Sequence, residues 1–111
     1  MSQHQSVMVV SEIEFRVSIS GDTDLESVFD ALADELASLE DATMGLLDST
    51  VSMDANESLI AATVTTEGDT FEAAAQTADS AVRAAVHAAG GATPGWNAIT
   101  VRDTSELVSN S

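Results

Sequence analysis

The sequence has three arginines and no lysine, and the chemistry of arginine is the most specific that its charged residues offer. Arg16, Arg83 and Arg102 are set against 19 acidic residues, and the formal net charge at pH 7 is −16. A guanidinium group binds carboxylates and other anions through two parallel hydrogen bonds. Arg16 and Arg102 lie in alternating segments near opposite ends of the chain, and Glu14 precedes Arg16 by two residues. If the fold makes neighbours of these segments, Glu14, Arg16 and Arg102 form a candidate anion-binding face.

A simpler interpretation of the same residues is a cross-strand ion pair between Glu14 and an arginine. Such a pair contributes only about 0.2 to 1 kcal/mol to a sheet and implies no ligand. In either case the alternation places Thr100 on the same face as Arg102, together with hydroxyl side chains of the other strands. Both interpretations stay open at this point.

A histidine and a tryptophan form the second set of candidates. His87 follows Asp79 and Arg83 at four-residue steps, so the three share one stripe of a helix. His87 is then either an acid–base group or a surface imidazole favoured by the negative end of that helix. Trp96, the only tryptophan, either lines a ligand pocket beside the helix end or closes the edge of the core.

Several kinds of chemistry lack the residues they need. The chain has no cysteine, which excludes a disulfide, a thiolate metal site and a cysteine nucleophile. It also lacks a nucleophile elbow, a P-loop, a dinucleotide-binding glycine pattern and an HExxH zinc motif. We therefore expect no cofactor and no metal ion, and we assign no catalytic residue.

The acidic balance limits the partners. Proteins bind nucleic acid and anionic membranes through Lys and Arg, so we expect neither as a partner. The acidity itself indicates either solubility and adaptation to salt or a basic protein partner. The apolar run at residues 7–10 is too short to span a membrane, and no basic residue precedes it as in a signal peptide. We therefore expect a cytoplasmic protein.

The elements that would hold these residues follow from hydrophobic periodicity. Residues 8–20 alternate as a half-buried strand, and Thr23 with Glu26 has the spacing of a capping box that begins a helix. The apolar stripe of this helix recurs at three- and four-residue spacing. Its members are Leu25, Val28, Phe29, Leu32, Leu36 and Leu39.

The second half of the chain repeats the pattern. Residues 44–53 and 59–66 read as two strands joined by a polar turn. Asp69 with Glu72 suggests a second capping box, and Gly90 with Gly91 suggests the end of that helix. Its predicted stripe contains Phe71, Ala75, Ala78, Val82, Val86 and Ala89. A last strand is expected over residues 97–103.

This order of elements predicts a ferredoxin-like βαββαβ domain of the α+β class. It has a four-stranded antiparallel sheet in the order 4-1-3-2, with two helices on one face. The expected domain covers residues 7–103, with flexible ends at residues 1–6 and 104–111.

The segment from Ala85 to Trp96, AVHAAGGATPGW, passes from a helix through glycines and a Thr-Pro-Gly-Trp turn to a final strand. It resembles small uncharacterised ferredoxin-like proteins of high-GC actinobacteria. The resemblance implies the fold and transfers no functional residue.

Three functions remain open. The first is a non-enzymatic acidic interaction module that forms a homo-oligomer, expected to be a dimer, and binds another protein. The second is an ACT-like regulatory domain that binds a small anion through Arg16 and Arg102. The third is a cofactor-independent enzyme of the dimeric ferredoxin-like type, with His87 or Trp96 near its pocket.

Overall fold

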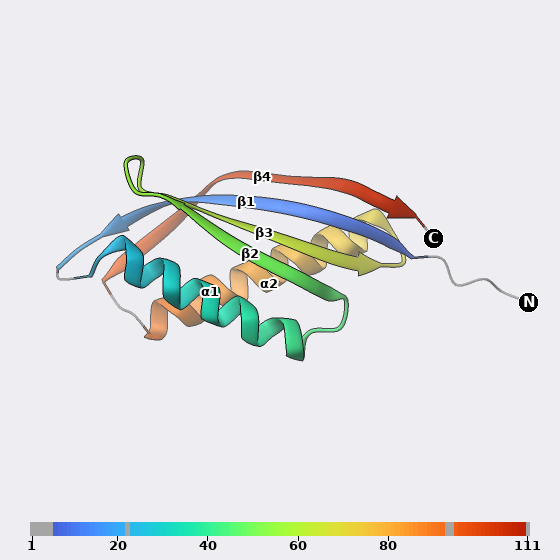
Figure 1. Cartoon of the computed structure of the whole chain (residues 1–111), viewed down its shortest axis with the longest axis horizontal. Helices are drawn as coiled ribbons and strands as arrows, with labels where there is room; N and C mark the ends of the chain where they lie inside the picture. Colours follow the sequence, from blue (N-terminus) through green and yellow to red (C-terminus); the bar gives the residue numbers. More distant parts are fainter. Residues whose placement is uncertain (1–5, 22, 93–94, 111) are drawn as a thin grey trace, which may run out of the picture.

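The computed structural model describes residues 6–21, 23–92 and 95–110 of the chain (Figure 1). It contains four strands and two helices in the order strand, helix, strand, strand, helix, strand. Their bounds are β1 Val7–Ile19, α1 Leu25–Ala42, β2 Leu46–Asp54, β3 Leu59–Gly68, α2 Phe71–Ala92 and β4 Trp96–Asn110.

The strands form one antiparallel sheet in the order β2-β3-β1-β4. Both helices cover the same face of that sheet, and the opposite face is open (Figure 1). The predicted ferredoxin-like βαββαβ fold and the strand order 4-1-3-2 are confirmed. β1 and β4 are neighbours over almost their full length, so the first and last strands lie side by side.

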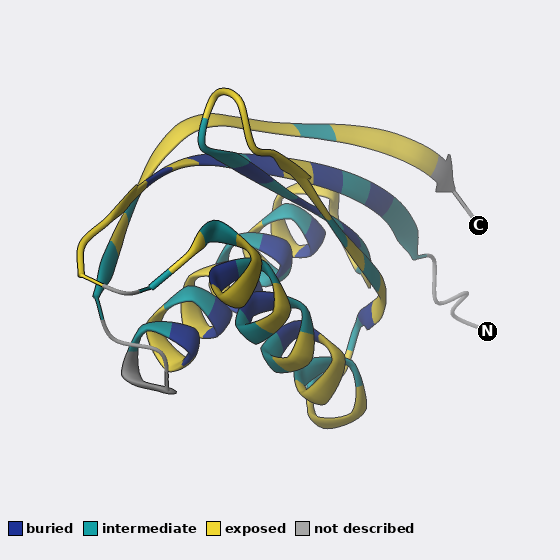
Figure 2. Cartoon of the chain, turned by 60° about the vertical axis from the view of Figure 1, so that its left-hand side comes forward, coloured by how far each residue is buried: buried dark blue, intermediate teal, exposed yellow. Residues whose placement is uncertain are grey.

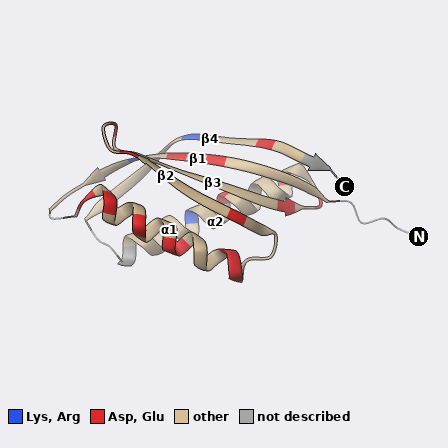
Figure 3. Cartoon of the chain, viewed as in Figure 1, with Lys and Arg blue, Asp and Glu red and all other residues tan. Residues whose placement is uncertain are grey.

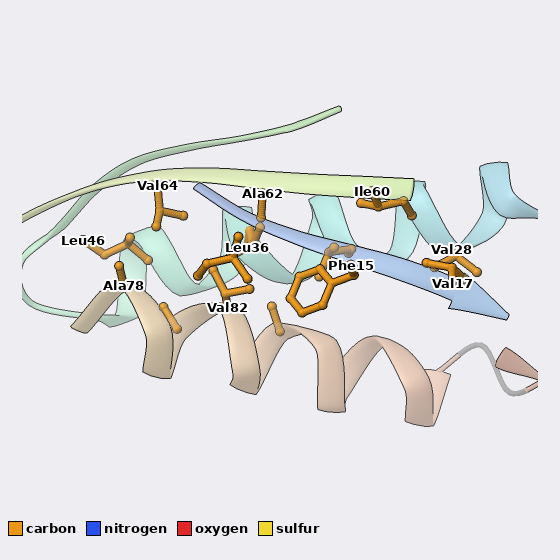
Figure 4. Packing of buried hydrophobic residues seen from close by; sticks show 14 residues of the cluster. Phe15, Val17, Val28, Leu36, Leu46, Ile60, Ala62, Val64, Ala78 and Val82 are labelled. Atoms are coloured by element: carbon orange, nitrogen blue, oxygen red, sulfur yellow. The ribbon is translucent and has the colours of Figure 1, made fainter. Parts of the chain in front are cut away.

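The core lies between the sheet and the helices. The odd-numbered residues of β1 from Val9 to Val17 are buried, and the even-numbered ones point to the open face. Figure 4 shows Phe15 of β1 beside Val82 of α2 in this layer. On α1, Val28, Leu32 and Leu36 are buried and the rest of the predicted stripe packs against them. The predicted stripe of α1 is confirmed.

The second helix differs from its predicted stripe at its start. Phe71 is 40% exposed, and the buried position in the first turn belongs to Ala74. The reason is close packing, because a methyl group added to Gly68 would lie 3.0 Å from the Ala74 nitrogen. Thr66 also donates a hydrogen bond of 2.7 Å from its hydroxyl to the Ala74 carbonyl. Only a small side chain fits so near the sheet.

Both helices begin one residue later than the predicted capping boxes. The Asp24 side chain accepts a hydrogen bond from the Ser27 backbone N–H at 2.8 Å. At the second helix the Thr70 hydroxyl accepts from the Ala73 backbone N–H at 3.0 Å. Each start offers two adjacent residues that can cap a helix, and local preference does not choose between them.

The predicted end of the second helix at Gly90 and Gly91 is also corrected, since α2 continues to Ala92. The left-handed turn falls on Gly95, at φ +102°. A methyl group there would meet the Thr23 hydroxyl oxygen at 2.7 Å and the Ser20 carbonyl at 3.1 Å, so only glycine fits.

The largest difference from the sequence analysis lies at the C-terminus. Residues 104–110 continue β4 beside β1, where we expected a polar tail. The Ser11 and Ser105 hydroxyls are hydrogen bonded at 2.7 Å across the pair. The first half of β1 requires a neighbour for its backbone groups, and this requirement leaves little trace in the side chains of an edge strand. Of the expected flexible start at 1–6, only Ser6 lies within the described residues.

Candidate functional site

A cavity lies between α2 and the paired strands β1 and β4. Its volume is about 200 Å³. Asp79 and Arg83 reach it from successive turns of α2, and Asp103 and Thr100 reach it from β4. The remaining wall is apolar and consists of Ile13, Phe15, Val82, Val86 and Ala98.

A β-bulge in β4 places its polar groups in this cavity. The register of β4 against β1 shifts between Glu14 and Phe15, so that Thr100 lies opposite Phe15 and Asp103 lies opposite Ile13. Val101 is the extra residue. Thr100 and Asp103 therefore both face the helices although they are three positions apart. The prediction that Thr100 lies on the open face was wrong, because strict alternation does not survive the bulge.

Asp79 and Asp103 form a pair of interacting carboxyl groups. Partial burial raises the pKa of Asp79, a hydrogen bond and charge repulsion from Asp103 raise it further, and Arg83 opposes these effects. Two ionised carboxylates side by side repel each other, so the raised pKa of Asp79 reflects both its burial and the nearby Asp103.

One oxygen of this pair lacks a partner. The Oδ1 atom of Asp79 is buried and accepts no hydrogen bond within the part of the chain that the structure describes. A buried acceptor without a partner costs roughly 1 to 3 kcal/mol. This cost, at the wall of a cavity lined by both polar and apolar side chains, marks the position where a donor from a bound molecule would be stabilised.

The arrangement supports two kinds of chemistry. The carboxyl pair can accept a hydrogen bond or a proton from a ligand, since a raised pKa brings an aspartate closer to the pH at which proton transfer is efficient. Arg83 can hold a negatively charged oxygen at the same cavity. Among the described residues, no three His, Asp or Glu side chains are grouped so as to hold a metal ion.

The predicted anion-binding residues lie on the open face of the sheet. Glu14 of β1 is directly opposite Arg102 of β4, and Arg16 is opposite Ile99. Glu14 is half-buried, and both arginines are exposed. A small hollow beside Glu14 is lined by Ser52 and Asp54 among others, and no arginine lines it. The fold thus brings Glu14 and Arg102 together, with Arg16 farther along the same face.

His87 and Trp96 share a separate, open cleft at the end of α2. Val86 and Ala98 line both this cleft and the Asp79 cavity, so the two are adjacent. His87 is exposed. Trp96 packs against the core, and its Nε1 atom is buried with no hydrogen-bond partner in the described structure. The stripe of Asp79, Arg83 and His87 therefore serves two sites, with the first two residues in the cavity and the third in the cleft.

Asp103 is the member of this site that the sequence analysis missed. Asp79 was noted only as a neighbour of His87 on the helix, and nothing paired it with Asp103. Their proximity depends on the bulge at Val101, and a bulge of this kind has no strong sequence signal. Two acids at distant positions in a chain with 19 acidic residues do not stand out.

Comparisons of the sequence with known families and proteins found no match. No protein-family model matches the chain, and no curated protein matches its sequence. Neither described helix is long and apolar enough to cross a membrane.

Two solved structures resemble the chain. One is a proposed antibiotic biosynthesis monooxygenase from Chloroflexus aurantiacus J-10-fl, with a TM-score of 0.54 at 18% identity over 92% of this chain and 93% of that one. The other is a proposed chlorite dismutase, with a TM-score of 0.54 at 10% identity over 91% of this chain. The alignment spans 42% of that second protein. At these identities the likeness establishes the ferredoxin-like fold and nothing finer.

Proposed function

We propose that this protein binds a small organic molecule in the cavity between α2 and β4, and that the ligand has an apolar body and one cationic or hydrogen-bond-donating group. The observation that carries the proposal is the buried, unpartnered Oδ1 atom of Asp79 at the wall of a cavity whose other side is formed by apolar side chains. The ligand's donor group is held by the Asp79–Asp103 pair, and its body contacts Phe15 and Val82.

The size and charge of the site define the ligand further. The cavity volume of about 200 Å³ lies below the roughly 300 to 1,000 Å³ typical of drug-sized ligands. A single ring with a short substituent suits this space. The net charge of −16 raises the local concentration of cations around the protein. A small apolar amine is therefore the favoured class.

The test is a titration with three molecules that share a ring and differ in one group, namely benzylamine, benzyl alcohol and benzoate. The indole of Trp96 lies beside the cavity and provides a fluorescence signal, and calorimetry provides the affinity. We expect the order benzylamine, benzyl alcohol, benzoate from tightest to weakest. Asp79→Asn should weaken benzylamine by roughly tenfold or more, because a charged hydrogen bond is lost.

The matched control is Asp34→Asn, which removes the same charge from an exposed position on α1. It should leave benzylamine binding within about twofold of the wild type, since exposed charges are screened. Binding of benzoate as tight as that of benzylamine, or equal effects of the two substitutions, would contradict the proposal.

A second candidate function is proton transfer without a cofactor, and the raised pKa of Asp79 favours it. In this case Asp79 accepts a proton from an activated C–H group of the ligand, and Arg83 stabilises the enolate oxygen that forms. Acetylacetone in D₂O tests this directly, because its acidic C–H exchanges for deuterium through an enolate. If the wild type accelerates this exchange and Asp79→Asn does not, the result supports catalysis. If exchange proceeds at the rate seen in buffer, the catalytic function is contradicted and only the ligand-binding proposal remains.

The other functions considered for this sequence rest on different surfaces. The anion-binding domain requires Arg16 and Arg102 on the open face, and it stays a prediction. The interaction module requires an exposed surface suited to a partner, for which β4 is the strongest candidate.

A further inference from the structure

β4 is an unusually long edge strand with exposed apolar side chains. It has 15 residues, whereas strands average about 5 to 6. Figure 2 shows that most of its length is exposed. Its exposed large apolar residues are Ile99 at 65%, Val101 at 42%, Leu107 at 47% and Val108 at 54%. An edge of this kind offers unpaired backbone groups to another strand.

The facing of its side chains restricts how a second copy can pair with it. A second register shift, between Met8 and Val9, makes Val108 another extra residue in β4. Between Val101 and Val108, β4 runs in regular register with β1, and Arg102, Thr104 and Glu106 lie on the open face. Two copies joined into one continuous sheet are related by a twofold axis perpendicular to that sheet. Directly opposite residues must then lie on the same face of the sheet. The axis must therefore place one residue opposite its own copy, because two consecutive residues point to different faces. We name each possible axis by that residue.

The charges on β4 distinguish among these axes. An axis through Arg102, Asp103 or Glu106 places that residue opposite the same residue of the second copy, so two like charges meet. An axis through Ser105 places Arg102, Asp103 and Glu106 opposite uncharged residues. An axis through Thr104 places Arg102 opposite Glu106 of the second copy, and the symmetry repeats this pair. Within the regular segment, only the Thr104 axis pairs opposite charges.

Neighbouring positions fit the same axis. Thr104 meets Thr104 of the second copy, and Thr–Thr pairs are favourable across strands. Val101 meets Leu107 of the second copy, which brings two exposed apolar side chains together. Arg102 also lies opposite Glu14 on β1, so it would stand between two acidic groups on the open face.

We propose that two copies of this chain pair β4 with β4 antiparallel about Thr104, which forms one eight-stranded sheet. Asp103 then lies opposite Ser105 of the second copy on the helix side. The second copy thereby extends the sheet beside the Asp79 cavity. The proposal does not depend on the ligand proposed for that cavity.

The test uses complementary charge reversals. Arg102→Glu places Glu opposite Glu106, and Glu106→Arg places Arg opposite Arg102, so each variant should dimerise at least about tenfold more weakly than the wild type. Native mass spectrometry at micromolar concentration separates a monomer of 11.5 kDa from a dimer of twice that mass. An equimolar mixture of the two variants should form a heterodimer, because both Arg–Glu contacts are then restored. The double variant should recover the homodimer.

Arg16→Glu is the matched control, since it makes the same charge reversal on the open face of the central strand β1. It should leave the dimer intact. Circular dichroism of each variant confirms folding. The equimolar mixture is a second check on folding, because an unfolded variant would not form the heterodimer.

A cysteine substitution tests the axis itself. Directly opposed residues in antiparallel strands have Cα atoms about 4.5 to 5.5 Å apart, within the range that a disulfide spans. The natural chain has no cysteine, so Thr104→Cys introduces a single thiol, which should cross-link on mild oxidation. Thr50→Cys on the other edge strand should not. A wild type that stays monomeric, a dimer that tolerates both single charge reversals, or preferential cross-linking through Thr50→Cys would overturn the proposal.

Discussion

The two edges of the sheet, β2 and β4, differ in length and in charge pattern. β2 has nine residues and carries Asp48 and Asp54 with no basic residue, whereas β4 has 15 residues and carries Arg102 as well as acids (Figure 3). No self-pairing of β2 can bring opposite charges together, and in the register centred on Val51 each Asp48 meets an Asp54. We therefore expect the sign pattern of an edge, as well as its apolar content, to determine whether it can pair with a partner.

The bulge at Val101 gives β4 a second role that β2 lacks. It turns Asp103 toward α2 while Arg102 stays on the open face. One strand therefore supplies the acidic group of the cavity and the basic group of the proposed interface from adjacent residues. On β2, the register shift lies between Leu46 and Asp48, at the end of the strand, and leaves Asp48 and Asp54 on the same face.

The largest effect is expected from a change in the core that supports both edges. Leu32 is 2% exposed beneath the sheet. Leu32→Asp buries an unpaired charge and should destabilise the domain by about 3 to 5 kcal/mol, a large share of the roughly 5 to 15 kcal/mol that holds a domain folded. Thermal unfolding followed by circular dichroism should show a low or absent transition, and neither edge should then support an oligomer. A melting curve like that of the wild type would show that α1 does not pack by this stripe.

A smaller effect is expected from giving β2 the charge pattern of β4. Asp48→Arg places a guanidinium opposite Asp54 of another copy, twice in the register centred on Val51. Two such pairs contribute roughly 0.4 to 2 kcal/mol, or up to about thirtyfold in affinity. If β4 pairs as proposed, a second edge able to pair should link dimers into longer assemblies.

Light scattering after size-exclusion chromatography measures this growth, and Asp48→Asn is the neutral control. Asp48→Arg should give species larger than a dimer, and Asp48→Asn should give few or none. If both variants behave as the wild type does, charge is not what keeps the β2 edge unpaired.

The fold could be predicted from the sequence because its main signals are local. The alternation around Phe15 and the stripe through Leu32 each identify one element, and the order of the elements then restricts the topology. The end of β4 could not be predicted in this way. Residues 104–110 are held by the backbone of β1 and by the Ser11–Ser105 contact, and both depend on a neighbour about 90 residues away.

The candidate site was less predictable for a related reason. A bulge moves every later side chain of its strand to the other face, so strict alternation placed Thr100 wrongly. The same bulge hid the contact between Asp79 and Asp103. The residues chosen from the sequence, Arg16 and His87 among them, stand out by type alone, whereas the cavity is defined by which faces meet.

The smallest predicted effect is a pH dependence of stability that arises where Asp79 of α2 meets Asp103 of β4. Burial and Asp103 raise the pKa of Asp79 in the folded state above its ordinary value of 3.8. A raised folded-state pKa means that the folded state binds the proton more tightly than the unfolded state does. The resulting stabilisation is complete below pH 3.8 and is lost as the pH rises through the folded-state pKa. Asp79→Asn keeps the shape of the protonated acid and cannot ionise.

The variant should therefore gain melting temperature relative to the wild type as the pH rises from about 4 to 7. Asp48→Asn on β2 makes the same substitution at an exposed position outside the pair and serves as the matched control. Differential scanning calorimetry across this range measures both differences. A melting-temperature difference between Asp79→Asn and the wild type that instead falls as the pH rises would mean that the folded protein stabilises ionised Asp79. The effect of Arg83 on the pKa of Asp79 would then outweigh those of burial and Asp103. In that case the cavity would prefer a neutral donor to a cation, because the charge on Asp79 would already be paired.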